Sequence, residues 1–474
     1  MVNKLSIDTF QSRLREFFYY PKLNRESDAV DDPAAFEHEM FTPRTDMSPL
    51  TSLYIHVPFC NYLCHFCGFY KELNQQYPEE TRQRYTDSVR AEIRRYARSG
   101  IFAEPTLEYV EFGGGTPTSL TADQLASILD TVGEEFTVRS NATVTMEGDA
   151  ITLGDTQKLR RLREHGLNRV SFGIQTLHEP LRRKLGLKPT IGEVRGAVDS
   201  IRTVGLPEYA TDIMYNLPDQ DVDMLLSDAE EILALEPDYI DAYSLTLWEN
   251  TGFKNRVDEG RGFSSQPTND QNVEMFERLK ALMTDRSMRL SRSYTFTQNR
   301  DYNYIRASRQ LISSGGNMIG IGASSRGYVN GAHYTNVSSI PGYIQALEQG
   351  RLPFDVAQSY DATEHAHRIM VLFPSMLLEL EKSKVPDFER FRATVDNLKD
   401  RGLLWEDKTT LGITDSGNTW AGNISREFFS DEQRKVMTRS FMYSLRHRLN
   451  PYNQDQSGVP KNRTRRTVRT EPGA

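Results

Sequence analysis

Cysteine is scarce in this sequence. Its 474 residues include three cysteines, Cys60, Cys64 and Cys67, which all fall within one short segment. An odd, tightly clustered set with no distant partner cannot form a disulfide framework. The small secreted class of disulfide-stabilised proteins is therefore excluded.

Long apolar runs are also absent. No stretch approaches the roughly 18 consecutive apolar residues of a transmembrane helix. Hydrophobic residues make up 38% and charged residues 26% of the chain, which is typical of a soluble protein with a sizeable core. The first twenty residues have no apolar signal core and no small-residue cleavage site, and their pattern predicts an amphipathic helix. We therefore expect a cytoplasmic protein without a membrane span.

Positive charge is in deficit overall but gathers at one end. The formal net charge of -8 argues against a general nucleic-acid-binding protein. The segment Lys461 to Arg469 is nevertheless basic, which predicts a disordered, solvated tail over residues 451–474. Binding of this tail to an anionic partner is the alternative.

Strand and helix signals alternate from Leu53 onward. Helical patterns separate six short apolar runs, which predicts parallel βαβ units in a barrel, complete or partial. Periodicity alone does not distinguish a barrel from an open sheet. The six predicted strands are 52–57, 109–112, 142–146, 169–174, 209–214 and 239–245.

A separate module is expected near the C-terminus. Helices over 365–381 and 387–401, followed by a small hairpin over 403–413, are typical of a winged helix. The length of the chain suggests two or three domains. We predict an N-terminal extension over residues 1–50, a barrel with substrate-covering segments over 51–355, the winged-helix-like domain over 356–450 and the tail.

The three cysteines form a C-x3-C-x2-C loop directly after the first predicted strand. Three thiolates so closely spaced can ligate three irons of a [4Fe–4S] cluster and leave the fourth iron open. A zinc site completed by His56 or His65 is an alternative. Buried structural cysteines are another.

The cysteine loop and four further motifs occur in the order found in radical S-adenosylmethionine (SAM) enzymes. They resemble the group of anaerobic coproporphyrinogen III oxidases and their relatives. The resemblance covers roughly residues 53–430 and implies an α/β fold, a partial (β/α)6 TIM-like barrel with a C-terminal winged-helix-like domain. The motifs are Tyr54–Cys60, Cys60–Cys67, Gly113–Thr118, Ser171–Gln175 and Asp212–Pro218.

The resemblance also implies cofactors and their residues. Cys60, Cys64 and Cys67 would hold a [4Fe–4S] cluster, and one or two SAM molecules would bind beside it. The family has an arginine where this chain has Leu187, which leaves that charge contact open; Arg183, Lys184 and Lys188 are candidates to replace it. The residues expected to contact SAM are Tyr54, Phe66, Gly114, Gly115, Thr116, Glu147, Gln175, Asp212 and Ala323.

The residues after the last cysteine distinguish the subtypes. The coproporphyrinogen oxidases have a further cysteine where this chain has Phe69, and the heme-chaperone branch tends to have an acidic residue where it has Gly68. The ending Cys67-Gly68-Phe69-Tyr70 is most similar to the heme-utilisation proteins of the anaerobilin synthase (HutW and ChuW) type. That resemblance implies opening and demetallation of heme without oxygen, through SAM-derived radical methylation, to give a linear tetrapyrrole and free iron.

Substrate and electron donor are less specified. Tyr294, Arg300 and Arg306 are candidate contacts of a flat tetrapyrrole that carries propionates, although packing explains the aromatic residue equally well. The expected partners are heme or a related tetrapyrrole and an electron donor such as flavodoxin or an NAD(P)H-linked reductant. An oxygen-independent coproporphyrinogen III oxidase and a heme chaperone are the alternative functions.

Overall fold

The computed structural model describes residues 10, 12–15, 19–23, 27–44, 50–102, 105–248, 251–265, 268–299 and 302–436. Arg300 and the predicted basic tail over residues 451–474 lie outside these ranges. None of the described residues among the first twenty is helical, so the amphipathic helix predicted there is not found in that part. Instead, the backbone N–H groups of Arg13 and Leu14 donate to the side chains of Asn269 and Asn423. The first helix is α1 (Pro33–Met40).

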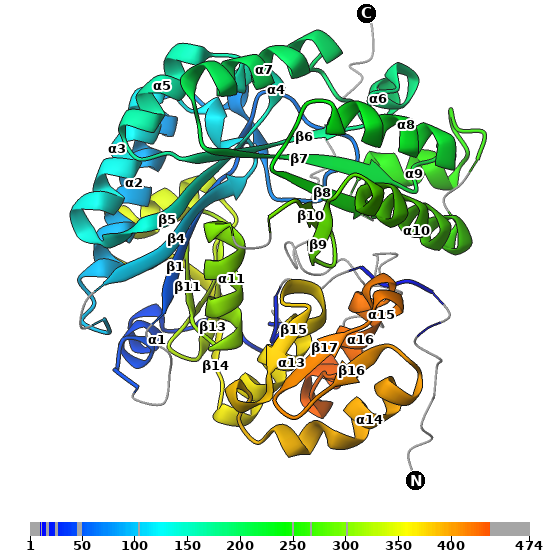
Figure 1. Cartoon of the computed structure of the whole chain (residues 1–474). Coiled ribbons are helices and arrows are strands. Elements are labelled where there is room, and N and C mark those ends of the chain that lie inside the picture. The colour runs from blue at the N-terminus through cyan, green and yellow to red at the C-terminus, as the bar shows by residue number, and fades with distance from the viewer. Residues whose placement is uncertain are drawn as a thin grey trace, which may run out of the picture.

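Six parallel strands, adjacent in chain order, form the centre of the molecule (Figure 1). All six strands predicted from the sequence are confirmed. Parallel strands are covered on both faces, so they appear in the sequence as nearly continuous apolar runs. They are β1 (Thr51–Val57), β4 (Thr106–Gly114), β5 (Thr137–Gly148), β6 (Arg169–Gln175), β7 (Glu208–Tyr215) and β8 (Tyr239–Ser244).

The sheet continues beyond these six strands at both sides but does not close. β11 (Asn317–Ile321) pairs parallel to β1, and β10 (Thr295–Thr297) pairs antiparallel to β8. The sheet ends at β14 (Phe354–Ser359) on one side and at β9 (Arg289–Arg292) on the other. The partial (β/α)6 barrel is thus confirmed, within a sheet of 12 strands. The two remaining strands are β12 (Arg326–Val329) and β13 (Ala332–Asn336).

Helices cover the outer face of the barrel (Figure 1). Capping boxes at Thr121 and Thr190 start α3 (Ala122–Glu135) and α7 (Ile191–Val204), since each threonine side chain accepts from a backbone N–H of the first turn. The apolar side of α7, which includes Val194, Val198 and Ile201, is buried. The helices of this part are α2 (Glu79–Ala97), α3 (Ala122–Glu135), α4 (Ala150–Leu153), α5 (Thr156–Glu164), α6 (Glu179–Leu185), α7 (Ile191–Val204), α8 (Val222–Leu233), α9 (Gly252–Asp258) and α10 (Asn269–Asp285).

Short elements connect the strands and the helices. β2 (Phe59–Cys60) pairs parallel with β3 (Glu72–Leu73). The 3-10 helices are η1 (Asn74–Gln76), η2 (Pro117–Ser119), η3 (Lys382–Lys384) and η4 (Phe388–Phe391). Between the barrel and the C-terminal part lie α11 (Asn303–Ser313) and α12 (Ile340–Glu348).

The C-terminal part combines helices with a small sheet. The helix predicted over 365–381 is too long: α13 (Ala362–Met376) ends earlier, and β15 (Glu379–Glu381) pairs with β17 (Thr410–Ile413) instead. The predicted hairpin is present, as β17 also pairs with β16 (Leu404–Glu406). The winged-helix-like arrangement therefore has a third strand. The other helices are α14 (Arg392–Asp400), α15 (Asp415–Thr419) and α16 (Ala421–Glu427).

The segment before α1 connects the C-terminal part to the barrel, where the Arg13 side chain donates to the Tyr215 hydroxyl of β7. The Arg13 side chain donates to the carbonyl oxygen of Thr419 at 2.7 Å, and the Tyr20 hydroxyl donates to Ser430 at 3.2 Å. The domain boundaries predicted after residues 50, 355 and 450 stay predictions. In the described part of the chain, no helix combines the length and the apolar character needed to cross a membrane.

Candidate cofactor site

The three cysteines lie on a loop whose ends are held side by side. Cys60 closes β2, and β2 pairs with β3, which follows the last cysteine. Within the loop, the Cys67 N–H donates to the Cys64 carbonyl oxygen at 3.4 Å. Cys60 is buried, Cys64 and Cys67 are partly exposed, and all three are free thiols. The loop thus keeps three thiols together without a disulfide.

The thiols affect one another electrostatically. Burial raises the pKa of Cys60 to about 11. Burial also raises the pKa of Cys64, and the neighbouring Cys67 and Cys60 raise it further. Lys71 opposes both shifts, because its ammonium group stabilises nearby thiolates. In the described ranges, no three His, Cys, Asp or Glu side chains are grouped to hold a single metal ion. An iron–sulfur cluster does not need three side chains to meet at one metal ion, since each thiolate bonds a different iron.

The glycine-rich turn after β4 is bonded directly to the cysteine loop. The Gly115 N–H donates to the Val57 carbonyl oxygen, and the Thr116 N–H donates to that of Phe59, both at 2.8 Å. The Thr116 hydroxyl donates to the Cys60 sulfur at 3.5 Å. Gly114 has a φ of +109°, and a Cβ atom there would lie 2.4 Å from the His56 ring. The structure therefore places Gly114, Gly115 and Thr116 beside the cysteines.

Tyr54 and Ala323 are both linked by hydrogen bonds to His56, whose ring lies against the glycine turn. The Tyr54 hydroxyl lies 3.2 Å from His56 Nδ1, and His56 Nε2 lies 3.1 Å from the Tyr70 carbonyl oxygen. Burial lowers the pKa of His56 to about 4, so the ring is neutral at pH 7. The Tyr85 hydroxyl donates to the His56 carbonyl oxygen at 2.7 Å and accepts from the Ala323 N–H at 2.9 Å. β1 and the turn after β11 are thereby joined.

Phe66 is the predicted SAM contact with the clearest packing role. It is partly buried against an apolar cluster of α6, β7 and α9 that includes Leu181 and Met214. Leu187 packs against the same cluster, so no charge stands at that position. Two of the candidate replacements are engaged elsewhere, since Arg183 pairs with Glu179 and Lys184 pairs with Asp219. Lys188 is exposed.

Three predicted polar residues come from consecutive strands of the barrel. Glu147 lies near the end of β5, Gln175 ends β6, and Asp212 lies within β7. Glu147 accepts a hydrogen bond of 3.2 Å from the Gly114 N–H. The Gln175 side chain hydrogen-bonds to Asp212, and its own Oε1 is buried without a partner. The strands thus bring Glu147 to the glycine turn and Asp212 close enough to Glu147 to raise its pKa.

Burial gives these carboxyl groups unusual acidities. It raises the pKa of Glu147 to about 8, with further contributions from the charges of Glu111 and Asp212. It also raises the pKa of Asp212, and the charge of Asp241 adds to that shift. A buried ligand with a positive charge would hold these carboxyl groups in their ionised form.

Four residues of this region are absent from the sequence predictions. Glu111 and Asp241 are partly buried residues on β4 and β8, burial raises the pKa of each carboxyl group, and Asp241 is the register partner of Asp212. Arg169 and Arg292 counter their charge. The sequence feature that could have indicated Glu111 and Asp241 is that each is the single charged residue inside the apolar run of its predicted strand.

The predicted substrate residues are not brought together. Tyr294 is buried, and its ring stacks on Tyr243 with centroids 5.3 Å apart. Arg306 is exposed on α11 and donates to Asn303 of the same helix at 2.8 Å. Substrate contacts of either residue stay predictions.

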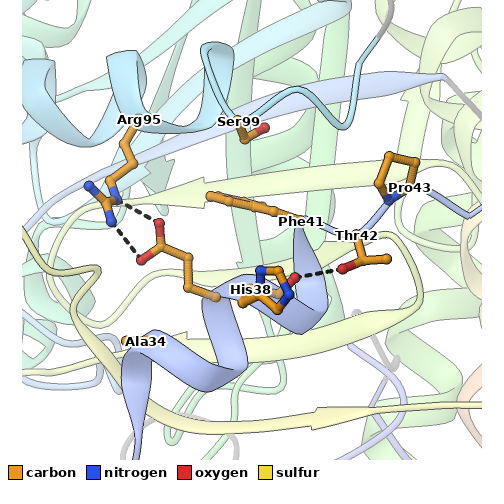
Figure 2. A pocket seen from close by; sticks show the side chains of 8 residues that line it. Ala34, His38, Phe41, Thr42, Pro43, Arg95 and Ser99 are labelled. Carbon is orange, nitrogen blue, oxygen red and sulfur yellow. Dashed lines mark hydrogen bonds and ion pairs between the residues drawn. The ribbon is translucent and has the colours of Figure 1, made fainter.

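An open pocket of about 480 Å³ lies elsewhere, between α1 and the end of α2 (Figure 2). The Glu37 carboxylate and the Arg95 guanidinium form an ion pair of 2.7 Å in this pocket. None of the predicted site residues lines it. The pocket is therefore separate from the cysteine loop.

Comparison with protein families identifies the central part of the chain. Residues 54–232 match the model of the Radical SAM superfamily. The chain contains a radical SAM domain. Such a domain implies a [4Fe–4S] cluster and SAM as cofactors. The matched residues include the cysteine loop, the glycine turn and the strands that provide Glu147, Gln175 and Asp212.

Two relatives match this chain over most of its length, and a third matches about half of it. The heme chaperone HemW of Lactococcus lactis is 26% identical over 398 residues, which cover 80% of this chain and 98% of that protein. The anaerobilin synthase of Escherichia coli O157:H7 is 26% identical over 376 residues, 78% of this chain and 82% of that protein. The oxygen-independent coproporphyrinogen III oxidase of Paracoccus denitrificans is 30% identical over 234 residues, 49% of this chain and 50% of that protein.

A solved structure shares the fold. Coproporphyrinogen III oxidase (HemN) from Escherichia coli, a radical SAM enzyme, superposes with a TM-score of 0.73 and 19% sequence identity. The match covers 87% of this chain and 96% of that chain. The radical SAM domain and the C-terminal part therefore have the architecture of that protein.

Proposed function

We propose that this radical SAM protein opens and demetallates heme without oxygen. SAM-derived radical methylation of the porphyrin would give a linear tetrapyrrole and free iron. The observation that supports a cluster and SAM site is that hydrogen bonds join the cysteine loop to the glycine turn, among them the bond from the Thr116 hydroxyl to the Cys60 sulfur. The similarity to anaerobilin synthase over 78% of the chain supports this choice of reaction.

Three thiolates, those of Cys60, Cys64 and Cys67, would hold the cluster. All three are free; Cys67 and Cys60 raise the pKa of Cys64, and the Lys71 ammonium opposes this shift and so favours the thiolate form that a cluster requires. When bound, the cluster supplies the electron that cleaves SAM. The chain's own contribution is to hold the three thiolates in one loop and to exclude competing reactions from the site.

The glycine turn and the barrel carboxylates would position SAM. Gly114 and Gly115 let the backbone approach the ligand closely, as glycine carries no side chain. Glu147 would accept a hydrogen bond from the SAM ammonium group. Burial raises the pKa of Glu147, and contact with this cation would favour the ionised carboxylate. The unpartnered Oε1 of Gln175 would accept from another donor of the ligand. Tyr54, Phe66, Asp212 and Ala323 complete the proposed set.

The proposed substrate is heme, and a reductant must supply the electrons that open the ring. All three named relatives bear the names of tetrapyrrole proteins, which supports a tetrapyrrole substrate. The proposed electron donor is flavodoxin or an NAD(P)H-linked reductant.

A heme chaperone is the second candidate function. The alignment to HemW covers 98% of that protein, so the chaperone has the same extent as this chain's matched part. A chaperone would bind heme and leave the macrocycle whole. The coproporphyrinogen oxidase is the remaining alternative: its sequence alignment covers only 50% of the relative, whereas the coproporphyrinogen III oxidase structure shares the fold over 96% of its length.

One anaerobic experiment separates these functions. The reconstituted protein is mixed with SAM, dithionite and heme, and the Soret band is followed while products are analysed by mass spectrometry. Loss of the Soret band with a methylated linear tetrapyrrole is the expected result. Heme that binds but stays intact would favour the chaperone, and decarboxylation of added coproporphyrinogen would favour the oxidase.

A further inference from the structure

The most exposed large apolar side chain in the described ranges lies on the cysteine loop. Phe69 is 56% exposed, and Leu63 of the same loop is 40% exposed. The other two such residues, Ile151 and Trp405, lie on α4 and β16. Scattered exposed apolar residues are ordinary, so exposure alone assigns Phe69 no role.

The neighbours of Phe69 are anchored on both sides. Gly68 is buried against Trp248, and a Cβ atom at Gly68 would lie 2.4 Å from the indole ring. On the other side, the Tyr70 ring stacks on His56, with centroids 6.2 Å apart. Residues 68 and 70 are thus fixed against the protein, whereas the side chain between them is left in solvent.

Lys71 fixes the backbone of Phe69 itself. Its ammonium group donates to the carbonyl oxygens of Cys67 and Phe69, at 2.7 and 3.2 Å. An ammonium group has three N–H donors, and these two bonds use two of them. The ammonium group, with its third donor and its positive charge, therefore lies at the backbone of the residue that carries the exposed ring.

We propose that the Phe69 ring is the platform on which the tetrapyrrole macrocycle stacks, with the Lys71 ammonium group donating to a propionate carboxylate. This inference rests on the proposed function and names the substrate contact of the same site. A porphyrin is a flat apolar ring system with carboxylates at its edge, and an aromatic ring beside an ammonium group complements both parts. A rigid backbone under the platform lowers the entropy cost of binding.

Heme affinity of cluster-loaded protein tests the platform. Heme is titrated anaerobically without SAM and followed by its Soret band, with iron and sulfide content measured for every variant. Phe69→Ser should weaken heme binding about tenfold, as the stacked phenyl area is lost. Phe69→Tyr should stay within about twofold of wild type, because it keeps the ring.

Matched variants separate the platform from general surface effects. Leu63→Ser, on the same loop, and Trp405→Ser, on the C-terminal sheet, should leave heme affinity unchanged. The wild type should bind heme more tightly than heme dimethyl ester, and Lys71→Met should remove that preference.

Two outcomes would overturn the inference. The first is a Phe69→Ser variant with wild-type heme affinity and full cluster content. The second is a Phe69→Ser variant that binds heme normally and whose cluster is reduced at the normal rate by dithionite but slowly by flavodoxin. That result would make the loop a docking surface for the electron donor. Failure of the wild type itself to bind heme would instead contradict the proposed function.

Discussion

The side-chain carboxylate of Glu92, on α2, accepts a hydrogen bond of 2.9 Å from the backbone N–H of Gly322. It also accepts from Asn336 at 2.8 Å and from Tyr343 at 2.6 Å. Gly322 directly precedes Ala323, so Glu92 fixes the turn that presents this proposed SAM contact. Burial raises the pKa of Glu92 to about 7, although its three donors oppose the shift.

The raised pKa of Glu92 predicts a specific dependence of stability on pH. The folded protein keeps this proton up to about pH 7, whereas an unfolded chain loses it near 4.5. Unfolding therefore releases a proton between these values, and stability should fall as pH rises through this window and then level off. Glu92→Gln should flatten the slope, which removes a change in stability of about 3 kcal/mol across the window.

Urea unfolding at several pH values measures this slope. Glu80→Gln, which changes an exposed carboxyl group of the same helix, is the matched control and should keep the wild-type slope. A Glu92→Gln protein with an unchanged slope would show that Glu92 is not the titrating group.

Glu147→Gln is expected to weaken SAM binding about tenfold, because a charge-assisted hydrogen bond to the ammonium group becomes a neutral one. Glu108→Gln is the control, since Glu108 lies on the neighbouring strand β4 and bonds to Arg139 at 2.8 Å. Equilibrium dialysis with the cluster-loaded proteins gives both affinities. Equal losses in the two variants would contradict a specific role for Glu147.

The same carboxyl group predicts how SAM affinity changes with pH. The pKa of free Glu147 is raised to about 8, and a cationic ligand prefers its ionised form. SAM binding should therefore release a proton and become tighter as pH rises toward about 8. Glu147→Gln should lose this dependence; a variant that retains it would assign the titration to another group.

Cys64→Ala should abolish cluster incorporation. Removal of one of three thiolates leaves two ligands on the loop, so iron and sulfide content should fall together with SAM cleavage. Leu63→Ala, an exposed neighbour, should retain both. Circular dichroism establishes that the variants remain folded. Full iron content and turnover in Cys64→Ala would refute the proposed cluster site.

The strands were predictable because their apolar runs are local, while the contacts around the site are not. Glu111 and Asp241 each lie inside such a run, and a run buried on both faces does not reveal which residues point into the barrel. The Lys71 bonds to loop carbonyls depend on how the loop folds back. In the described part of the first twenty residues, tertiary hydrogen bonds to Asn269 and Asn423 engage the backbone N–H groups of Arg13 and Leu14 in place of helical ones.

Gly68→Ala should disturb the cysteine loop through one added methyl group. That group would lie 2.4 Å from the Trp248 ring, which is buried and has the Arg15 guanidinium 4.8 Å from its centroid, so the ring has little freedom to move. We expect a loss of about 1–3 kcal/mol in the free energy of unfolding and a lower cluster content.

Gly133→Ala provides the contrasting substitution. Gly133 lies in α3, and a Cβ atom there would meet nothing within 4 Å. Alanine in a helix interior should stabilise the protein by about 0.5–1 kcal/mol, because glycine loses more backbone entropy on folding. Thermal unfolding and iron analysis of both variants measure the difference. If Gly68→Ala behaves as Gly133→Ala does, then contact with Trp248 does not hold the loop, and the anchoring that presents Phe69 must come from Tyr70 and Lys71 alone.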